Sequence, residues 1–221
     1  MFTEEYGTSG LDPCSNTMKF ILGTKLNMTQ VWTDDGHVHP VTIIVAGPNT
    51  VTQVKTAEKD GYSALQVGFG ERNPKNLSKA VKGHLKNLGN FLGLKEFRLD
   101  EAATMKVGDK IDASVFQAGD AIVISAISKG KGFQGVVKRH GFHGGSRTHG
   151  QKHSEREPGA IGGGARAGGR VAKGMRMAGR MGGDRVTVKG SKIIQVNAEK
   201  NVILVSGPVP GRRGTLVEIR G

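Results

Sequence analysis

The residues whose types and spacing could do chemistry lie in one stretch of the chain, residues 129–185. Gly130-Lys-Gly-Phe-Gln-Gly135 matches a G-x-G-x-x-G loop, whose glycines let backbone N–H groups approach a phosphate closely. With Val137 it also fits the glycine-rich loop of protein kinases. No strong helical pattern follows it, and the chain contains no H-R-D or D-F-G sequence. We therefore expect no small-molecule substrate, and a nucleotide-dependent enzyme is the alternative hypothesis.

A metal site is the second chemistry that this stretch could offer. Four histidines follow one another at spacings of 3, 6 and 4, namely His140, His143, His149 and His153. They have no cysteine partner nearby, because Cys14 is the only cysteine of the chain. Histidines in a segment rich in glycine and arginine more often stack on bases or bind phosphates. We therefore expect no metal and no cofactor here.

The composition excludes several classes of protein. The 221 residues are 36% hydrophobic, and no apolar run approaches the roughly 18 residues that a membrane span needs. The start lacks the basic and apolar pattern of a secretory signal, and one cysteine cannot make a disulfide framework. No pair of carboxylates suited to acid–base catalysis and no G-x-S-x-G sequence is evident. We expect a cytoplasmic protein that is not an enzyme and has no membrane partner.

Positive charge and glycine are concentrated together in residues 129–185. This stretch holds 13 lysines and arginines against three acids, so it carries +10 of the chain's formal charge of +13. It also holds 17 of the 35 glycines, which prevent a stable amphipathic helix at a membrane surface. A solvated basic linker is the plain alternative, and a general nucleic-acid chaperone is another.

Lysine and arginine neutralise phosphates, and glycine lets the backbone pass through narrow RNA grooves. Only Phe133 and Phe142 are aromatic in the stretch, which favours folded RNA over a single strand. With Lys25 from outside the stretch, the candidate RNA-binding residues are Lys25, Lys129, Lys131, Lys138, Arg139, His140, Arg147, His149, Lys152, His153, Arg156, Arg166, Arg170, Lys173, Arg176, Arg180 and Arg185.

The flanking sequences must provide the scaffold that positions this stretch. Short runs rich in β-branched residues predict many strands at close spacing, which is typical of an antiparallel barrel or sandwich. The runs are 19–23, 29–33, 38–46, 50–55, 63–68, 110–116, 121–127, 185–189, 192–197, 201–206 and 215–220.

One segment of the scaffold predicts a helix. Five apolar residues recur at spacings of 4, 4, 3 and 4, and four lysines lie off their stripe. The apolar residues are Leu77, Val81, Leu85, Leu88 and Leu92, and the lysines are Lys75, Lys79, Lys82 and Lys86. We expect these lysines to form a solvated face, with RNA contact as the alternative.

Several sequence blocks resemble the large-subunit ribosomal protein L3 family of bacterial type. They begin with Gly23-Thr-Lys-Leu-Asn-Met-Thr29, which is similar to that family's G-x-K-x-G-M-T opening, and they follow the family's order to Gly211. The others are Asp60-Gly-Tyr62, Gly130-Lys-Gly-Phe-Gln-Gly-Val-Val-Lys-Arg139, Thr148-His-Gly150, Pro158-Gly-Ala-Ile-Gly162, Lys173-Gly-Met-Arg-Met-Ala-Gly179, Arg185-Val-Thr-Val188 and Val205-Ser-Gly-Pro-Val-Pro-Gly211.

This resemblance implies a mainly β fold. We expect a translation-protein-type β-barrel with a small helical insertion near 75–92 and a long irregular Gly/Arg-rich extension. The parts would be a flexible leader (1–17), the first part of the barrel (18–128), an RNA-threading extension (129–185) and the completion of the barrel (186–221). Met18, which stands just before the first predicted strand, is an alternative start to Met1.

The resemblance also implies a function. A protein of this family is expected to be a structural constituent of the large ribosomal subunit that binds directly near the 3′ end of 23S-type rRNA and nucleates early subunit assembly. Its extension would reach toward the peptidyl transferase centre, with a tip around 163–167. The fourteenth and nineteenth proteins of the large subunit would be its neighbours.

The chain departs from the family pattern in three places. Asn27 stands where the opening motif usually has glycine, which puts the geometry of that turn in question. Near the tip, Gly162-Gly-Gly-Ala-Arg-Ala-Gly-Gly169 replaces a more polar run. Some bacterial members carry a methylated glutamine there, and because this chain has none between Ile161 and Val171, we do not expect that modification. The leader has no counterpart in the family pattern.

Overall fold

The computed structural model describes residues 19–33, 35–86, 88–99, 105–163 and 168–221. The predicted leader, residues 1–17, lies outside them. The strands are β1 (Phe20–Trp32), β2 (Val38–Val45), β3 (Asn49–Lys55), β4 (Ala64–Glu71), β5 (Phe91–Arg98), β6 (Lys110–Ile111), β7 (Ala121–Ile127), β8 (Phe133–Gln134), β9 (Gly179–Arg180), β10 (Arg185–Asn197), β11 (Val202–Ser206) and β12 (Leu216–Arg220).

Helices are few and short. They are the α-helices α1 (Ala57–Asp60), α2 (Lys79–Leu85) and α3 (Val136–His140) and the 3₁₀ turns η1 (Pro74–Asn76) and η2 (Ala113–Val115). Within the described part of the chain, no helix is long and apolar enough to cross a membrane.

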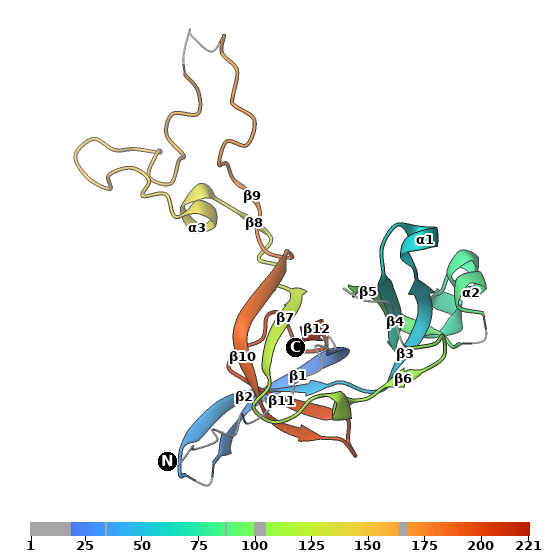
Figure 1. Ribbon diagram of the computed structural model, residues 1–221. Coiled ribbons are helices and arrows are strands. Elements are labelled where there is room, and N and C mark those ends of the chain that lie inside the picture. The colour runs from blue at the N-terminus through green and yellow to red at the C-terminus, as the bar shows by residue number, and fades with distance from the viewer. Residues whose placement is uncertain (1–18, 34, 87, 100–104, 164–167) are drawn as a thin grey trace, which may run out of the picture.

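Six strands close into an antiparallel barrel in the order β1-β12-β7-β10-β11-β2 (Figure 1). Its strands come from both ends of the sequence, because β10, β11 and β12 follow the basic stretch and β1, β2 and β7 precede it. Side chains alternate across each strand, so Val217 and Ile219 of β12 point into the barrel, where they pack with Ile21, Ile124 and Ile203. The expected mainly β fold with a barrel is confirmed.

A second sheet, of order β5-β4-β3-β6, packs against the outside of the barrel at β1. Alternation along β1 buries both of its faces, because Ile21 enters the barrel core while Phe20 and Leu22 enter a second core with this sheet. The rings of Phe20 and Phe97 are stacked with their centroids 4.4 Å apart, and the Arg220 guanidinium lies 5.1 Å from the Phe97 ring centroid. One strand therefore joins the two sheets.

A buried carboxylate connects the barrel to both of its attachments. Glu218 of β12 is 8% exposed, and one of its oxygens lies 3.2 Å from the Lys95 ammonium on β5. Its other oxygen pairs with the Arg185 guanidinium at the first residue of β10, where the basic stretch returns to the barrel. On the neighbouring strands β7 and β10, the hydroxyl groups of Ser125 and Thr187 form a hydrogen bond of 2.8 Å with each other. The two cations compensate the cost of burying the carboxylate.

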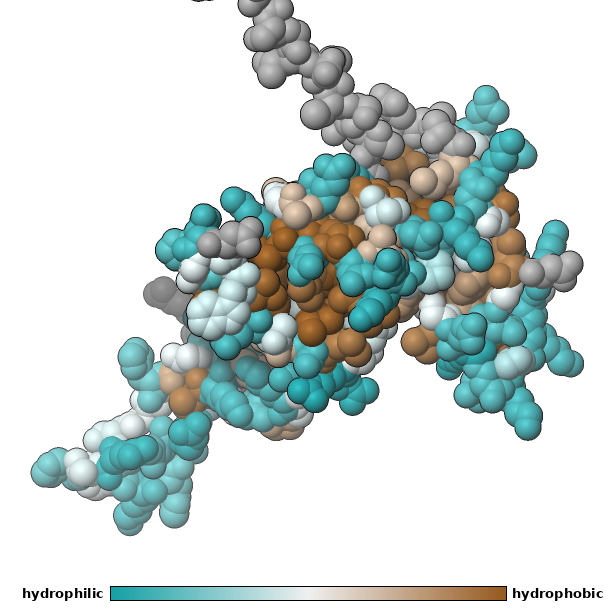
Figure 2. Space-filling model, turned by 90° about the horizontal axis from the view of Figure 1, so that it is seen from below, coloured by the Kyte–Doolittle hydropathy of each residue, from teal (hydrophilic) through white to brown (hydrophobic). Residues whose placement is uncertain are grey.

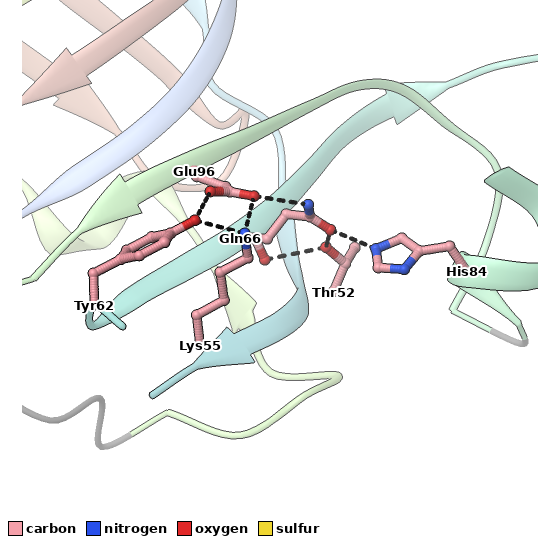
Figure 3. Close-up of polar contacts among 6 residues, drawn as sticks. All are labelled: Thr52, Lys55, Tyr62, Gln66, His84 and Glu96. Carbon is pink, nitrogen blue, oxygen red and sulfur yellow. Dashed lines mark hydrogen bonds and ion pairs between the residues drawn. The ribbon is translucent and has the colours of Figure 1, made fainter. Parts of the chain in front are cut away.

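A polar network holds α2 against the second sheet (Figure 3). The Lys55 ammonium on β3 donates to the Tyr62 hydroxyl at 2.7 Å and lies 2.8 Å from the Glu96 carboxylate on β5. Gln66 on β4 links this ion pair to α2, since its amide donates to Glu96 at 3.3 Å and its amide oxygen lies 2.8 Å from the His84 ring nitrogen. The network thus fixes the position of the helix.

The predicted helix is shorter than its apolar stripe. It ends at Leu85, and residues 91–98 form β5, which the sequence did not predict. Leu92 is 53% exposed on β5 and does not belong to a helical face. Pairing with β4 along its length and glycines at 89 and 93 favour a strand over a continued helix. The run 110–116 is also not one strand, because only β6 pairs and η2 follows it.

Truncation of Phe97 tests the contact between the barrel and the second sheet. Phe97 is 0% exposed, so Phe97→Ala should lower the free energy of unfolding by about 3–5 kcal/mol in urea denaturation. Phe133→Ala is the control, because Phe133 is 77% exposed and its loss should cost about 0.5 kcal/mol or less. Equal losses in the two variants would contradict the packing described here.

The polar network predicts an acid-dependent part of stability. The hydrogen bond from Lys55 lowers the pKa of Glu96 below its ordinary value of 4.5. A carboxyl whose pKa is lower in the folded state stabilises the fold above pH 4.5 and loses that stabilisation as the pH falls toward the folded value. The midpoint of urea unfolding should therefore fall less steeply below pH 4.5 in Glu96→Gln than in the unchanged protein. Parallel pH profiles would contradict this role.

Candidate nucleic-acid interface

The basic stretch, residues 129–185 and called the arm from here on, projects from the barrel between β7 and β10 (Figure 1). Its stem continues the β7–β10 pair as an antiparallel ribbon, since Phe133 and Gln134 of β8 pair with Arg180 and Gly179 of β9. Backbone hydrogen bonds of 2.9 Å from Lys131 to Met181 and from Met181 to Gly132 complete the ribbon. The barrel thus sets the direction in which the arm leaves.

Gly182 allows the two sides of the stem to meet. It has a φ of 76°, and a Cβ on it would lie 2.2 Å from the backbone oxygen of Lys129. Such a contact is far inside van der Waals distance, so only glycine fits this position. At the base of the arm, the need for glycine therefore has a structural cause.

Two of the predicted RNA-binding residues shape the arm itself. Arg139 and His140 lie at the end of α3, and both contact the backbone oxygen of Met177, at 2.7 and 3.1 Å. Val136 is the buried anchor of this helix. These contacts join the outgoing and returning sides of the arm beyond the stem.

A loop beyond α3 is held by a few polar contacts. The Gly145 N–H donates to the backbone oxygen of Glu155 at 2.9 Å, and the Arg147 side chain pairs with the Glu155 carboxylate at 2.6 Å. The Arg176 guanidinium lies 5.1 Å from the centroid of the Phe142 ring, so the returning side packs on this loop. Arg147 is thus partly neutralised inside the arm.

Most of the other predicted residues point outward. Each is exposed, and none of them takes part in an ion pair within the described residues. They are Lys129, Lys131, Lys138, His149, Lys152, His153, Arg156, Arg170, Lys173, Arg176 and Arg180. Arg166 and most of the expected tip lie outside the described residues. The structure therefore places a row of uncompensated cations along the arm.

Two predicted residues lie at the root of the arm with partners of their own. Arg185 pairs with Glu218, as described above. Lys25 on β1 donates to the backbone oxygens of Val209 and Gly211, at 2.6 and 3.2 Å. Burial, together with the nearby charge of Lys129, lowers the pKa of the Lys25 ammonium. Lys25 therefore holds the loop before β12 against the root of the arm.

That loop carries two exposed arginines that the sequence reasoning missed. Arg212 and Arg213 lie between Gly211, next to the end of β7, and Gly214, whose N–H donates to the backbone oxygen of Lys25 at 2.8 Å. They extend the positive surface of the arm onto the barrel. The signal in the sequence was a pair of arginines flanked by glycines, outside the region of highest charge.

The alternative chemistries find little support in the geometry. The G-x-G-x-x-G residues form the stem and the entry to α3, a helix of five residues. No three histidine, cysteine, aspartate or glutamate side chains of the described chain gather closely enough to hold a metal ion. The arrangement that remains is an extended, positively charged surface.

Substitution of Gly182 tests the stem. Gly182→Ala places a methyl group against the backbone of Lys129, so the ribbon must open, and the amides of Lys131 and Met181 should exchange their hydrogens faster. Hydrogen–deuterium exchange measures this. Gly190→Ala is the matched control, because Gly190 also has a positive φ of 80° but its Cβ would meet no atom within 4 Å. Unchanged exchange in Gly182→Ala would contradict the close contact, and equally fast exchange in both variants would show a general loss of stability in place of an opened stem.

Comparison with known proteins shows the family of the chain. The family model described as "Ribosomal protein L3" matches residues 82–206. The chain is 49% identical over 200 residues to the "Large ribosomal subunit protein uL3" of Herpetosiphon aurantiacus, covering 90% of this chain and 94% of that protein. It is 48% identical over 205 residues to the proteins of that name from Syntrophobacter fumaroxidans and Streptomyces coelicolor, covering 92% of this chain and 97% and 95% of theirs. With a barrel, an arm and identity of this extent, the chain belongs to the ribosomal protein L3 family.

Proposed function

We propose that this chain is a primary rRNA-binding protein and that the arm is its main RNA-binding element. As a member of the ribosomal protein L3 family, it is a structural, non-enzymatic constituent of the large ribosomal subunit. The observation that carries the proposal is the row of exposed cations along the arm without acidic partners in the described residues. Uncompensated charge of this kind favours a polyanionic partner.

The mechanism is electrostatic anchoring combined with threading of the backbone. Each lysine or arginine that meets a phosphate releases condensed counterions, which supplies much of the binding free energy. The arm has little apolar packing of its own, with Val136 buried and Phe142 covered by Arg176. A thin, glycine-rich ribbon can therefore enter grooves of folded RNA that a helix or sheet could not.

The finer parts of the proposal rest on family resemblance. We place the binding site near the 3′ end of 23S-type rRNA, the arm tip toward the peptidyl transferase centre, and the action early in assembly of the subunit in the cytoplasm. The fourteenth and nineteenth large-subunit proteins are the proposed neighbours. Hydroxyl-radical footprinting of the full chain on large-subunit rRNA tests the binding site, and crosslinking within assembled subunits tests the neighbours.

Neutralising the arm tests its role directly. Lys152, Arg156, Arg170 and Lys173 are exposed and make no side-chain hydrogen bond or ion pair within the described residues. Changing all four to glutamine should weaken binding to large-subunit rRNA and lower the slope of log affinity against log salt by about 0.7–0.9 per lost contact. Filter binding between 50 and 200 mM salt measures the affinity and its salt slope. Over this range the affinity of the unchanged protein should fall about 10³–10⁵-fold if it makes 6–10 phosphate contacts.

A barrel variant controls for the loss of net charge. Lys189 and Lys192 lie on β10, Lys200 in the turn after it and Lys106 in the loop before β6; all four are exposed and outside the arm, and their change to glutamine, which we call the barrel variant, removes the same charge. We expect a smaller effect from this variant than from the arm variant. Flat salt dependence, or equal binding to unrelated RNA and DNA in competition, would overturn the proposal.

A further inference from the structure

The arm is not the only place where positive charge is concentrated. Residues 72–95 hold six lysines and arginines and no aspartate or glutamate. Because the arm carries +10 and this segment +6 of a chain with +13, the remaining residues together are acidic. The segment comprises η1, α2 and the start of β5, so its charge belongs to the second sheet.

Besides Arg72, four of these cations are exposed and have no acidic partner among the described residues. They are Lys75, Lys79, Lys82 and Lys86, and we call them the lysine face. Lys79 and Lys82 lie three residues apart on α2 and therefore share one side of the helix. Figure 2 shows hydrophilic side chains gathered at the end of the molecule where α2 lies, on the right of that view.

Contacts between α2 and the second sheet fix the position of the lysine face. Leu85 of α2 is 1% exposed, and the His84 ring on the same helix contacts Gln66 of β4 (Figure 3). Ser78 caps the helix by accepting a hydrogen bond from the Val81 N–H at 3.3 Å. The helix is therefore held on the sheet while its lysines remain exposed. Such an arrangement presents the lysines to a partner in a fixed position.

A glycine within this face has no role in the fold. Gly83 lies one residue beyond Lys82 in the middle of α2, where glycine weakens a helix relative to alanine. A Cβ on Gly83 would meet no atom within 4 Å, so the fold leaves room for a side chain. Because Gly83 has no side chain, the surface between the lysines stays flat, which suits close approach by a partner.

The composition of the segment identifies the class of partner. Lysine is depleted in protein–protein interfaces, which depend on aromatic residues, methionine and arginine. Lysine and asparagine are frequent contacts to the phosphates and sugars of nucleic acid, and Asn73 and Asn76 are exposed beside these lysines. Arg72 and Lys110 add two more cations, beside one acid, Glu71, around an open hollow of about 940 Å³ next to this segment.

We infer that the lysine face is a second RNA-binding surface, which contacts the phosphate backbone of the same rRNA independently of the arm. This inference rests on the proposed function, because the rRNA bound by the arm supplies the partner. Figure 1 shows α2 and the arm on different sides of the molecule, so the two surfaces reach different parts of the RNA. Binding at both sites raises the affinity because the second contact is intramolecular.

The test changes Lys75, Lys79, Lys82 and Lys86 to glutamine in the full chain. Binding to large-subunit rRNA should weaken about tenfold or more at 100 mM salt, with a salt slope lower by about 0.7–0.9 per contact. Hydroxyl-radical footprinting should show loss of one group of protected nucleotides while those protected by the arm remain. The four-lysine barrel variant described above is the matched control and should keep both groups.

Gly83→Gln tests the same surface without a change in charge. The variant should fold with an unchanged or higher midpoint of thermal unfolding, because the added side chain meets no atom of the protein. It should weaken binding and lose the same group of protected nucleotides as the four-lysine variant. Unchanged binding and footprint in both variants would overturn the inference.

The outcomes separate this inference from the proposed function. If the arm variant binds weakly and the lysine-face variant binds normally, the inference fails and the proposed function stands. If only the lysine-face variant is weakened, the arm is not the main RNA-binding element and the second surface stands. If the barrel control is weakened as much as the lysine-face variant, net charge explains the effect and the inference fails.

Discussion

The pairing of Glu218 with Arg185 and Lys95 links the three parts of the molecule that strand pairing and apolar packing also hold together. Glu218 belongs to the barrel, Arg185 to the end of the arm and Lys95 to the second sheet, so one buried carboxylate joins all three. Removing either cation would leave a buried charge partly uncompensated, which is far more costly than losing a surface ion pair. Together with the β7–β10 pairing and the core around Phe97, this pairing relates the arm and the second sheet to the barrel, which is the frame that the proposed binding to two parts of one RNA would use.

Charge separation follows from the same frame. The arm and the lysine face repel each other, and placing them on different sides of an otherwise acidic chain reduces that repulsion. Some acids of the scaffold pair with its own cations, as in the contacts Lys19–Asp120 and Lys55–Glu96. The two proposed RNA-binding surfaces, by contrast, have few acids, and most of their cations have no ion pair within the described residues.

Much of the fold could be predicted from the sequence, because alternating β-branched residues determine strands locally. The run 121–127 is β7 residue for residue. The errors arose where distant contacts decide the structure. The apolar stripe continued to Leu92, but pairing with β4 made that region a strand. The sequence did not indicate the contacts of Lys25 with the backbone of Val209 and Gly211, which lie more than 180 residues away in sequence, and the predicted contact of Lys25 with RNA stays a prediction. No local pattern carries that information.

The arm shows why counting cations overestimates the number that remain free for RNA. Arg139 and His140 hold the Met177 carbonyl, and Arg147 pairs with Glu155, so these three groups give the arm its shape. The ribbon has little apolar packing, so without these polar contacts little would oppose the conformational entropy of its backbone. Their neighbours, such as Lys138 and Lys152, remain exposed. A glycine-rich arm that must stay narrow cannot be stabilised by a hydrophobic core, so it uses part of its own charge for structure and presents the remainder to a partner. Sequence reasoning located the charge correctly, but only the geometry distinguishes the two uses.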